Sequence, residues 1–300
     1  MFVPSTVTAV ASRLLQAGNA YGARPSWRSW SIGGPSEIVV LVLLLSAACA
    51  YLVACRRARA RSQTVEAGSW LPFAAGLLVV AVACFSPIDA IGDTWLLSVH
   101  MLQHLLLAYL APGLLVLGLR SPVFALHARS GETEARRRRT APYRRRAAAL
   151  RRIVGRPWTV LPVAAFATWV WAIPQLFDFA SEHPLLHDFE HATLFCSGLA
   201  MWWLIVAPRS TTRRTSRERL TFLGFGSIAA ASVCIPLLLD PSPAYPLYAK
   251  APRLAGLSAL ADQRLAAIVV LLAYGVAFLA IALRIRGGLQ RRAIGFESGK

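Results

Sequence analysis

Charged residues are scarce in this sequence. They make up 15% of its 300 residues, whereas hydrophobic residues make up 56%. A soluble domain of this size usually carries about 25% charged and about 45–50% apolar residues. The shortage of charge therefore excludes an ordinary soluble domain and predicts a protein that crosses a membrane several times.

Acidic residues are the scarcest charged group, with 14 Asp and Glu against 32 Lys and Arg, which gives a net charge of +18. The arginines stand in short blocks between apolar runs, as they do in cytoplasmic loops of membrane proteins. The blocks at 136–139 and 144–146 have only Tyr143 as an aromatic neighbour. Because nucleic-acid modules interleave aromatic residues with basic ones, we expect contact with anionic lipids and no nucleic acid.

The sequence also lacks a CxxC motif and a recognisable signal peptide. Its N-terminal residues have neither a basic start nor a long apolar core, so residues 1–34 are predicted to form an extracytoplasmic tail. The cysteines fall in or at the ends of apolar runs and are expected to be small buried side chains. They are Cys49, Cys55, Cys84, Cys196 and Cys234.

Long apolar runs are what the sequence has in abundance. A bilayer core is spanned by about 20 apolar residues of helix. Seven runs meet this need, at about 37–55, 69–87, 95–119, 158–177, 187–207, 220–239 and 263–285. They predict an all-α fold, a polytopic membrane helix bundle of about seven transmembrane helices over residues 35–286.

The basic residues predict how this bundle is oriented. They follow the first, third, fifth and seventh runs, whereas the segments after the second and fourth runs contain no Lys or Arg. The positive-inside rule then places the N-terminus outside and the C-terminus inside. Residues 120–157 become a basic cytoplasmic loop, and residues 287–300 a cytoplasmic tail. The acidic residues near the extracytoplasmic segments are Asp89, Asp93, Asp178, Glu182 and Asp188.

Five of the six histidines fall on the predicted extracytoplasmic side. His127 lies in the basic loop and is expected to be polar surface. The other five belong to the third run and to the start of the fifth run: His100, His104, His183, His187 and His191. Residues four apart lie about 40° apart around a helix, so each set forms a stripe on its helix.

A polar stripe at membrane depth is costly unless it faces protein, water or a ligand. Two facing stripes could supply three or four imidazoles to one metal ion. Imidazole binds copper, zinc, iron and nickel alike. The spacing therefore predicts a metal or haem site at the extracytoplasmic face and leaves the metal open.

Five further residues are candidates to support this site. Gln103 falls on the face of the third-run histidines, and Glu190 lies on the side of the fifth-run set. The thioether of Met101 would favour Cu(I), but it points some 100° away, which favours core packing. Asp262 and Gln263 begin the seventh run, where an aspartate is either functional or a helix N-cap.

The stretch "HDFEH" (187–191) also matches the HxxEH pattern of inverted zinc proteases. Those enzymes are large and soluble, and nothing in this chain suggests a substrate cleft. Membrane di-iron hydroxylases and desaturases need more histidines, usually on the cytoplasmic side. We therefore expect a protein that is not an enzyme.

Three segments resemble the membrane-bound cytochrome c oxidase assembly factors of the CtaG type (the Caa3/CtaG family). "HMLQHLLLAYLAP" (100–112) is similar to the family's first histidine signature. "HPLLHDFEHATLFCSGLAMWW" (183–203) resembles the second histidine segment, which ends in a tryptophan pair. "YPLYAKAPRLAGLSALADQRLAA" (245–267) resembles the third, built around Asp-Gln, although the glycine and Met-Trp pair expected after it are replaced by Ala266-Ala267-Ile268-Val269.

This resemblance implies a multi-pass protein of the bacterial plasma membrane that helps copper reach a haem–copper oxidase on the outer side. Oxidase subunits and copper chaperones would then be its partners, and copper its metal. Two alternatives stay open: a cytochrome-b-like protein that holds haem between a histidine of the third run and one of the fifth, and a copper transport or resistance protein.

The predicted orientation can be tested with reporter fusions. Reporters joined after residues 92 and 185 should signal from outside the membrane, and reporters after residues 140 and 213 from inside, because loop arginines stay in the cytoplasm. An inside signal at residue 185 would put the histidines on the cytoplasmic face and overturn the predicted location of the site.

Overall fold

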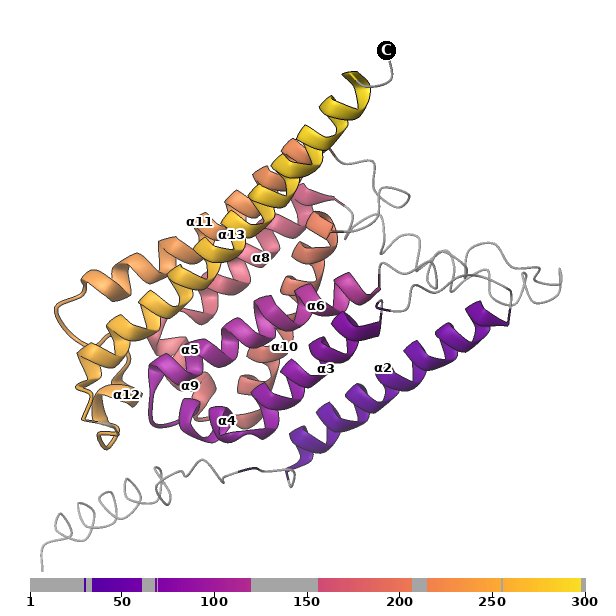
Figure 1. The fold of residues 1–300 in the computed structure, drawn as a ribbon. Helices are drawn as coiled ribbons and strands as arrows, with labels where there is room; N and C mark the ends of the chain where they lie inside the picture. Colours follow the sequence, from indigo (N-terminus) through magenta and orange to yellow (C-terminus); the bar gives the residue numbers. More distant parts are fainter. Residues whose placement is uncertain are drawn as a thin grey trace, which may run out of the picture.

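The computed structural model describes residues 30, 34–60, 68, 70–119, 156–206, 215–254 and 256–297, and every regular element in these ranges is helical. Figure 1 shows long helices packed side by side, with α2 at one edge beside α3. The basic loop and His127 lie outside the described residues. The elements are α2 (Pro35–Arg59), α3 (Trp70–Phe85), α4 (Pro87–Gly92), α5 (Leu97–Leu105), the π-helix η1 (Leu106–Leu110), α6 (Ala111–Gly118), α8 (Pro157–Trp171), α9 (Pro174–Ser181), α10 (Pro184–Val206), α11 (Ser216–Leu239), α12 (Pro246–Lys250) and α13 (Ala259–Glu297).

Local sequence explains how several helices begin and end. α2 has Pro35 in its first turn, Glu37 close behind and arginines in its last turn, which suits the helix dipole. α11 starts with a capping box, in which Thr215 Oγ1 accepts from the Glu218 amide and the Glu218 carboxylate accepts from the Thr215 amide. These signals place the helix ends at the boundaries of the apolar runs.

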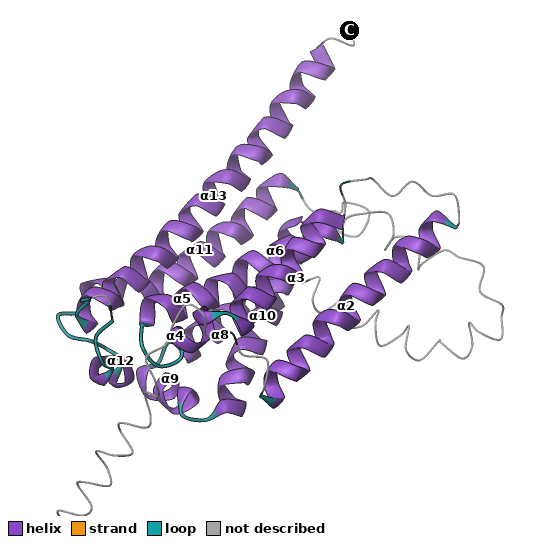
Figure 2. Ribbon diagram, turned by 60° about the horizontal axis from the view of Figure 1, so that its bottom comes forward, coloured by secondary structure: helices purple, strands orange, loops and turns teal. Residues whose placement is uncertain are grey.

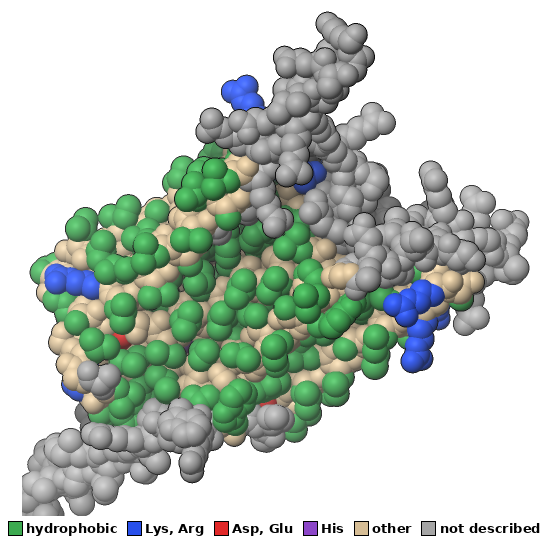
Figure 3. Space-filling model, viewed as in Figure 1, with side chains coloured by type: hydrophobic (Ala, Val, Ile, Leu, Met, Phe, Trp, Pro, Cys, Tyr) green, Lys and Arg blue, Asp and Glu red, His purple; other side chains and the backbone are tan. Residues whose placement is uncertain are grey.

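Five helical segments are long and apolar enough to cross a membrane: α2, the continuous α5–η1–α6 segment, α10, α11 and the first 22 residues of α13. The space-filling view agrees, because apolar side chains are spread across the face shown in Figure 3. The prediction of an all-helical membrane protein is thus confirmed. α8 and α9 make a sixth segment if they are one broken span, while α3, with 16 residues, is shorter than the others. Seven spans and the orientation stay predictions.

The fourth predicted run, 158–177, is not one helix. α8 ends at Trp171, α9 starts at Pro174, and their axes differ by 76°. The residue before a proline is driven out of the helical region, and Ile173 is indeed extended, with φ −68° and ψ 119°. The prediction that all cysteines are buried was also wrong, since Cys49 and Cys196 are exposed.

The third run contains an irregularity next to the predicted site. η1 widens the helix immediately before Pro112, which has no N–H to donate to the Ala108 carbonyl four residues earlier. Gly198 of α10 packs against that carbonyl so closely that an added Cβ would overlap the Ala108 oxygen. The backbones of α10 and η1 are therefore in direct contact, which fixes the separation of α5 and α10.

Three short helices, α4, α9 and α12, gather at one end of the bundle, which we call the site end (Figures 1 and 2). α5, α10 and α13 all begin there. α5 packs against α4 and α13, and α10 packs against η1, α6 and α8. The histidines of α5 and α10 consequently occupy the same end of the bundle.

Substitution of Gly198 by alanine tests this close contact. Overpacking a core usually costs about 1–3 kcal/mol, which in a protein of this size corresponds to about 2–10 °C of melting temperature. We expect Gly198→Ala to lower the thermal unfolding midpoint in detergent by that amount. The control is Gly275→Ala, because a Cβ there meets nothing within 4 Å. Equal midpoints for the two variants would refute the contact.

Candidate metal centre

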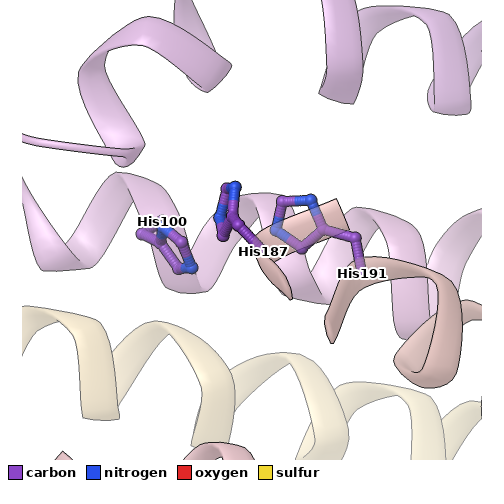
Figure 4. A group of neighbouring side chains, drawn as sticks. All are labelled: His100, His187 and His191. Atoms are coloured by element: carbon purple, nitrogen blue, oxygen red, sulfur yellow. The ribbon is translucent and has the colours of Figure 1, made fainter. Parts of the chain in front are cut away.

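Two helices supply the candidate ligands. α5 carries His100 and His104, and α10 carries His187, Glu190 and His191; we call these five residues the His cluster. Spacings of three and four residues bring side chains to one face of each helix, and the two faces meet. Figure 4 shows His100 of α5 and His187 and His191 of α10 with their rings gathered in the space between the two helices.

The rings lie close together. The Nε2 atoms of His100 and His104 are 2.8 Å apart, so one donates a hydrogen bond to the other. Ring centroids are 4.2 Å apart for His187 and His191, and 5.4 Å apart for His100 and His187. His104 Nε2 also lies 3.5 Å from Glu190 Oε1. Among the described residues, two sets have donor atoms within 4.8 Å of one another: His100, His187 and His191, and His100, His104 and Glu190.

Four of the five residues have a buried donor atom that makes no hydrogen bond. His100 and Glu190 are 0% exposed. His100 Nδ1, His187 Nε2, His191 Nε2 and both Glu190 oxygens make no hydrogen bond. Buried polar groups are almost always paired, so a concentration of unpaired nitrogen and oxygen atoms needs an explanation such as an ion. The His cluster could therefore hold a metal.

Gln103 and Gly92 shape the wall beside His100. Gln103 is 0% exposed and donates from Nε2 to the Ala83 carbonyl at 3.1 Å and to Asp89 at 2.7 Å. A Cβ on Gly92 would lie 3.1 Å from the His100 Cα, so glycine permits a close approach of α4 to α5. Gln103 was predicted to support the site, and its two hydrogen bonds join α5 to α3 and α4.

Asp262 acts as a helix cap, but for another helix than its own. Its carboxylate accepts from the Leu97 amide at 2.7 Å, from the Ser98 amide at 3.2 Å and from the Ser98 hydroxyl. These donors are the free N–H groups of the first turn of α5, two and three residues before His100. The sequence offered capping or function as alternatives; the structure shows α13 capping the helix that carries His100.

Gln263 ties α13 to the end of α11. Its side-chain oxygen accepts from the Ala244 amide at 2.7 Å, and its nitrogen donates to the Leu237 carbonyl at 3.0 Å. Gln263 is 1% exposed. The Asp-Gln pair therefore holds the neighbouring helices in place and does not reach the His cluster directly.

Three aromatic residues that the sequence analysis did not single out close the cluster. The Phe177 ring lies 5.0 Å from the His100 ring and the Tyr248 ring 6.4 Å from it. Tyr248 donates from its hydroxyl to the Gly92 carbonyl at 2.6 Å, and Tyr245 donates to the Ala172 carbonyl at 3.0 Å. Of these three residues, only Tyr245 and Tyr248 lie in a segment that the sequence analysis had noted, the one that begins "YPLY".

Asp89 and Asp93 form an acidic margin beside the cluster. Asp93 Oδ1 lies 3.7 Å from His187 Nε2. Burial raises the pKa of the Asp89 carboxyl, and the negative charge of Asp93 raises it further. Burial likewise raises the pKa of Asp93, with a smaller contribution from Asp188. An incoming cation would relieve this repulsion, so the margin favours cations.

Two predicted site residues lie elsewhere. His183 is exposed in the turn before α10, where its ring lies 4.2 Å from Phe179 and its Nδ1 donates to the Phe179 carbonyl. Met101 packs against the apolar group around Leu97 and Phe177, as expected for a core side chain. The set of candidate ligands that the structure brings together therefore leaves out His183 and includes Glu190.

The sequence model of the cytochrome c oxidase caa3 assembly factor family (Caa3_CtaG) matches residues 49–290, a range that includes the whole His cluster and the Asp-Gln pair. No curated protein and no solved structure matches the chain.

Asp262→Ala tests the capping of α5 from α13. Hydrogen bonds to a charged group contribute about 1.5–3 kcal/mol each, and about 1.4 kcal/mol corresponds to tenfold in an opening equilibrium. Backbone amides over residues 97–104 should therefore exchange with deuterium at least about tenfold faster in the variant. Asp240→Ala is the control, because the hydrogen bonds that Asp240 accepts among the described residues come from Ser242 in its own turn. Unchanged exchange in Asp262→Ala would exclude the cap.

Proposed function

The chain belongs to the cytochrome c oxidase caa3 assembly factor family, and we propose that it binds copper in the His cluster and delivers it to a haem–copper oxidase at the extracytoplasmic face. The observation that carries the proposal is the set of converging donors: four imidazoles and one carboxylate come together from two helices, and four of these five side chains have a buried nitrogen or oxygen atom that makes no hydrogen bond. Family membership supports a role in assembly and no catalysis.

The donor chemistry supports a transition metal. Imidazole is a good ligand for copper and zinc, whereas magnesium and calcium prefer oxygen. A metal bound by nitrogen atoms at 2.0–2.1 Å in tetrahedral geometry keeps its ligands about 3.3–3.5 Å apart. Within each set, donor atoms up to 4.8 Å apart would need to approach by up to about 1.4 Å, and the 2.8 Å between the Nε2 atoms of His100 and His104 would need to widen; rotations of the side chains can supply both changes.

Copper is preferred over zinc because of the family. An oxidase that contains copper needs copper delivered, and the site lies in the protein that assists its assembly. Imidazole alone does not separate the two metals. Elemental mass spectrometry of the purified protein therefore decides whether copper is bound.

The packing of the site speaks against haem. The histidine rings are in mutual contact, with centroids 4.2 to 5.8 Å apart. The described cavity that His104 lines measures only about 90 Å³, whereas cofactor pockets usually hold about 300–1,000 Å³. A porphyrin would have to separate α5 from α10. An absorption spectrum without a Soret band after reconstitution with haemin would agree with this.

The surroundings of the site also favour a one-sided binding protein over a transporter. The same small cavity continues from His104 into the bundle, where its lining is mostly apolar and includes Leu105, Val233 and Val270. Ion transport needs polar groups along the whole path.

The proposed partners are oxidase subunits and copper chaperones at the extracytoplasmic surface. The basic cytoplasmic loops are proposed to contact anionic lipid.

Alanine variants of the cluster test copper binding. His100→Ala, removing a fully buried ring, should lower the copper bound per protein markedly. His183→Ala and His127→Ala are matched controls, because His183 is exposed and His127 belongs to the segment 120–157 that the sequence predicts to be a cytoplasmic loop. Copper in detergent-purified protein is measured by elemental mass spectrometry. If His100→Ala, His104→Ala and His187→Ala each contain as much copper as the wild-type protein, the site is refuted.

The delivery role has a cellular test. A strain carrying His100→Ala and His104→Ala together should make the variant at normal level, since the apolar helix still inserts. Its oxidase should contain haem but too little copper, and excess copper in the medium should partly restore activity by mass action. The copper-to-haem ratio of its membranes is the measurement. A normal ratio at wild-type protein level would exclude delivery through this site.

A further inference from the structure

The His cluster contains more donors than one ion can use. Five side chains converge there, and their donor atoms fall into the two sets described above, each with its atoms within 4.8 Å of one another. One set, His100 with His187 and His191, offers three imidazoles and reaches Asp93 through His187. The other, His100 with His104 and Glu190, offers two imidazoles and a carboxylate, and His104 lines the interior cavity.

We propose that the His cluster provides two alternative positions for one copper ion, an outer one at His100, His187 and His191 and an inner one at His100, His104 and Glu190, with His100 as the shared ligand. This inference rests on the proposed function, because it concerns how the same site hands its metal on.

The chemistry of imidazole limits the cluster to one ion at a time. A neutral ring has a single lone pair available, so His100 serves only one metal position at any moment. Simultaneous occupation of both positions through His100 would require a second deprotonation of its ring. Sharing of His100 therefore makes the two positions alternatives.

Each position keeps one of its ligands in contact with an oppositely charged group when the ion is at the other position. When the outer position is filled, His104 and Glu190 remain 3.5 Å apart and can pair. When the inner position is filled, His187 remains 3.7 Å from Asp93 and can pair with it. A donor that is buried without a partner costs about 1–3 kcal/mol, so the His104–Glu190 and His187–Asp93 contacts lower the energy of the two arrangements.

The exchange between positions needs no redox step. His100 keeps its bond to Cu(I) while the nitrogens of His187 and His191 leave the metal and His104 Nε2 and a Glu190 oxygen bind it. Each incoming ligand binds through a lone pair, which on His104 is that of an unprotonated ring nitrogen. The copper stays Cu(I) throughout.

Variants that disable one position at a time test the proposal. Glu190→Gln and His104→Ala remove inner ligands, and His187→Ala and His191→Ala remove outer ones, so the result does not depend on one variant folding. Cu(I) affinity of the full-length protein in detergent is measured by competition with a colorimetric Cu(I) chelator. Circular dichroism and size-exclusion chromatography confirm that each variant is folded, and His183→Ala is the matched control.

Two alternative positions predict strong non-additivity. Wild-type protein should bind one Cu(I), and each single variant should still bind one with affinity reduced by about tenfold or less, since the other position remains. The double variant His191→Ala/Glu190→Gln should lose about 100-fold or more. X-ray absorption should count three imidazole ligands in Glu190→Gln and two in His191→Ala.

Other outcomes would overturn the proposal. If His191→Ala alone and Glu190→Gln alone each abolish binding, the five residues form one site, and the proposed copper function survives. Two Cu(I) bound to wild-type protein would show simultaneous occupation and exclude a shared His100. If wild-type protein binds no Cu(I), the proposed function fails together with this inference.

Discussion

The arrangement of this protein depends on one physical problem, the burial of unpaired imidazole and carboxylate donors at the end of an apolar helix bundle. His100 and Glu190 have no exposed surface, and four of the five side chains of the His cluster have a buried donor atom that makes no hydrogen bond. Such atoms are tolerated only where the surrounding structure holds them in position. The interactions around the cluster can be understood as the means of holding them.

The cluster lies among three helix starts, which is an unfavourable place for a cation. The N-termini of α5, α10 and α13 each carry a partial positive charge. Asp262 binds the free amides at the start of α5 and so offsets the charge nearest His100. Glu190 and the acidic margin of Asp89 and Asp93 add negative charge on the other sides. The carboxylates at the site end therefore offset the positive charge of the helix starts and would favour a bound cation.

Rigidity comes from contacts that join distant parts of the chain. Asp262 and Gln263, neighbours on α13, bind the start of α5 and the end of α11 respectively. Tyr248 binds the Gly92 carbonyl, which connects α12 to the wall beside His100. On the inner side, Gly198 lets α10 touch the π-helix that follows His104. The separation of α5 and α10, and with it the spacing of the ligands, is set by these contacts.

The sequence by itself determined the membrane character, the helices and the two histidine stripes, because apolar run length and helical spacing are local properties. It also pointed to Asp262 and Gln263, though not to what they bind. Only the tertiary structure decided that Asp262 caps α5, that Phe177 and Tyr248 cover His100, and that His183 turns away while Glu190 joins the ligands. These features depend on distances between helices far apart in sequence, which a one-dimensional pattern does not contain.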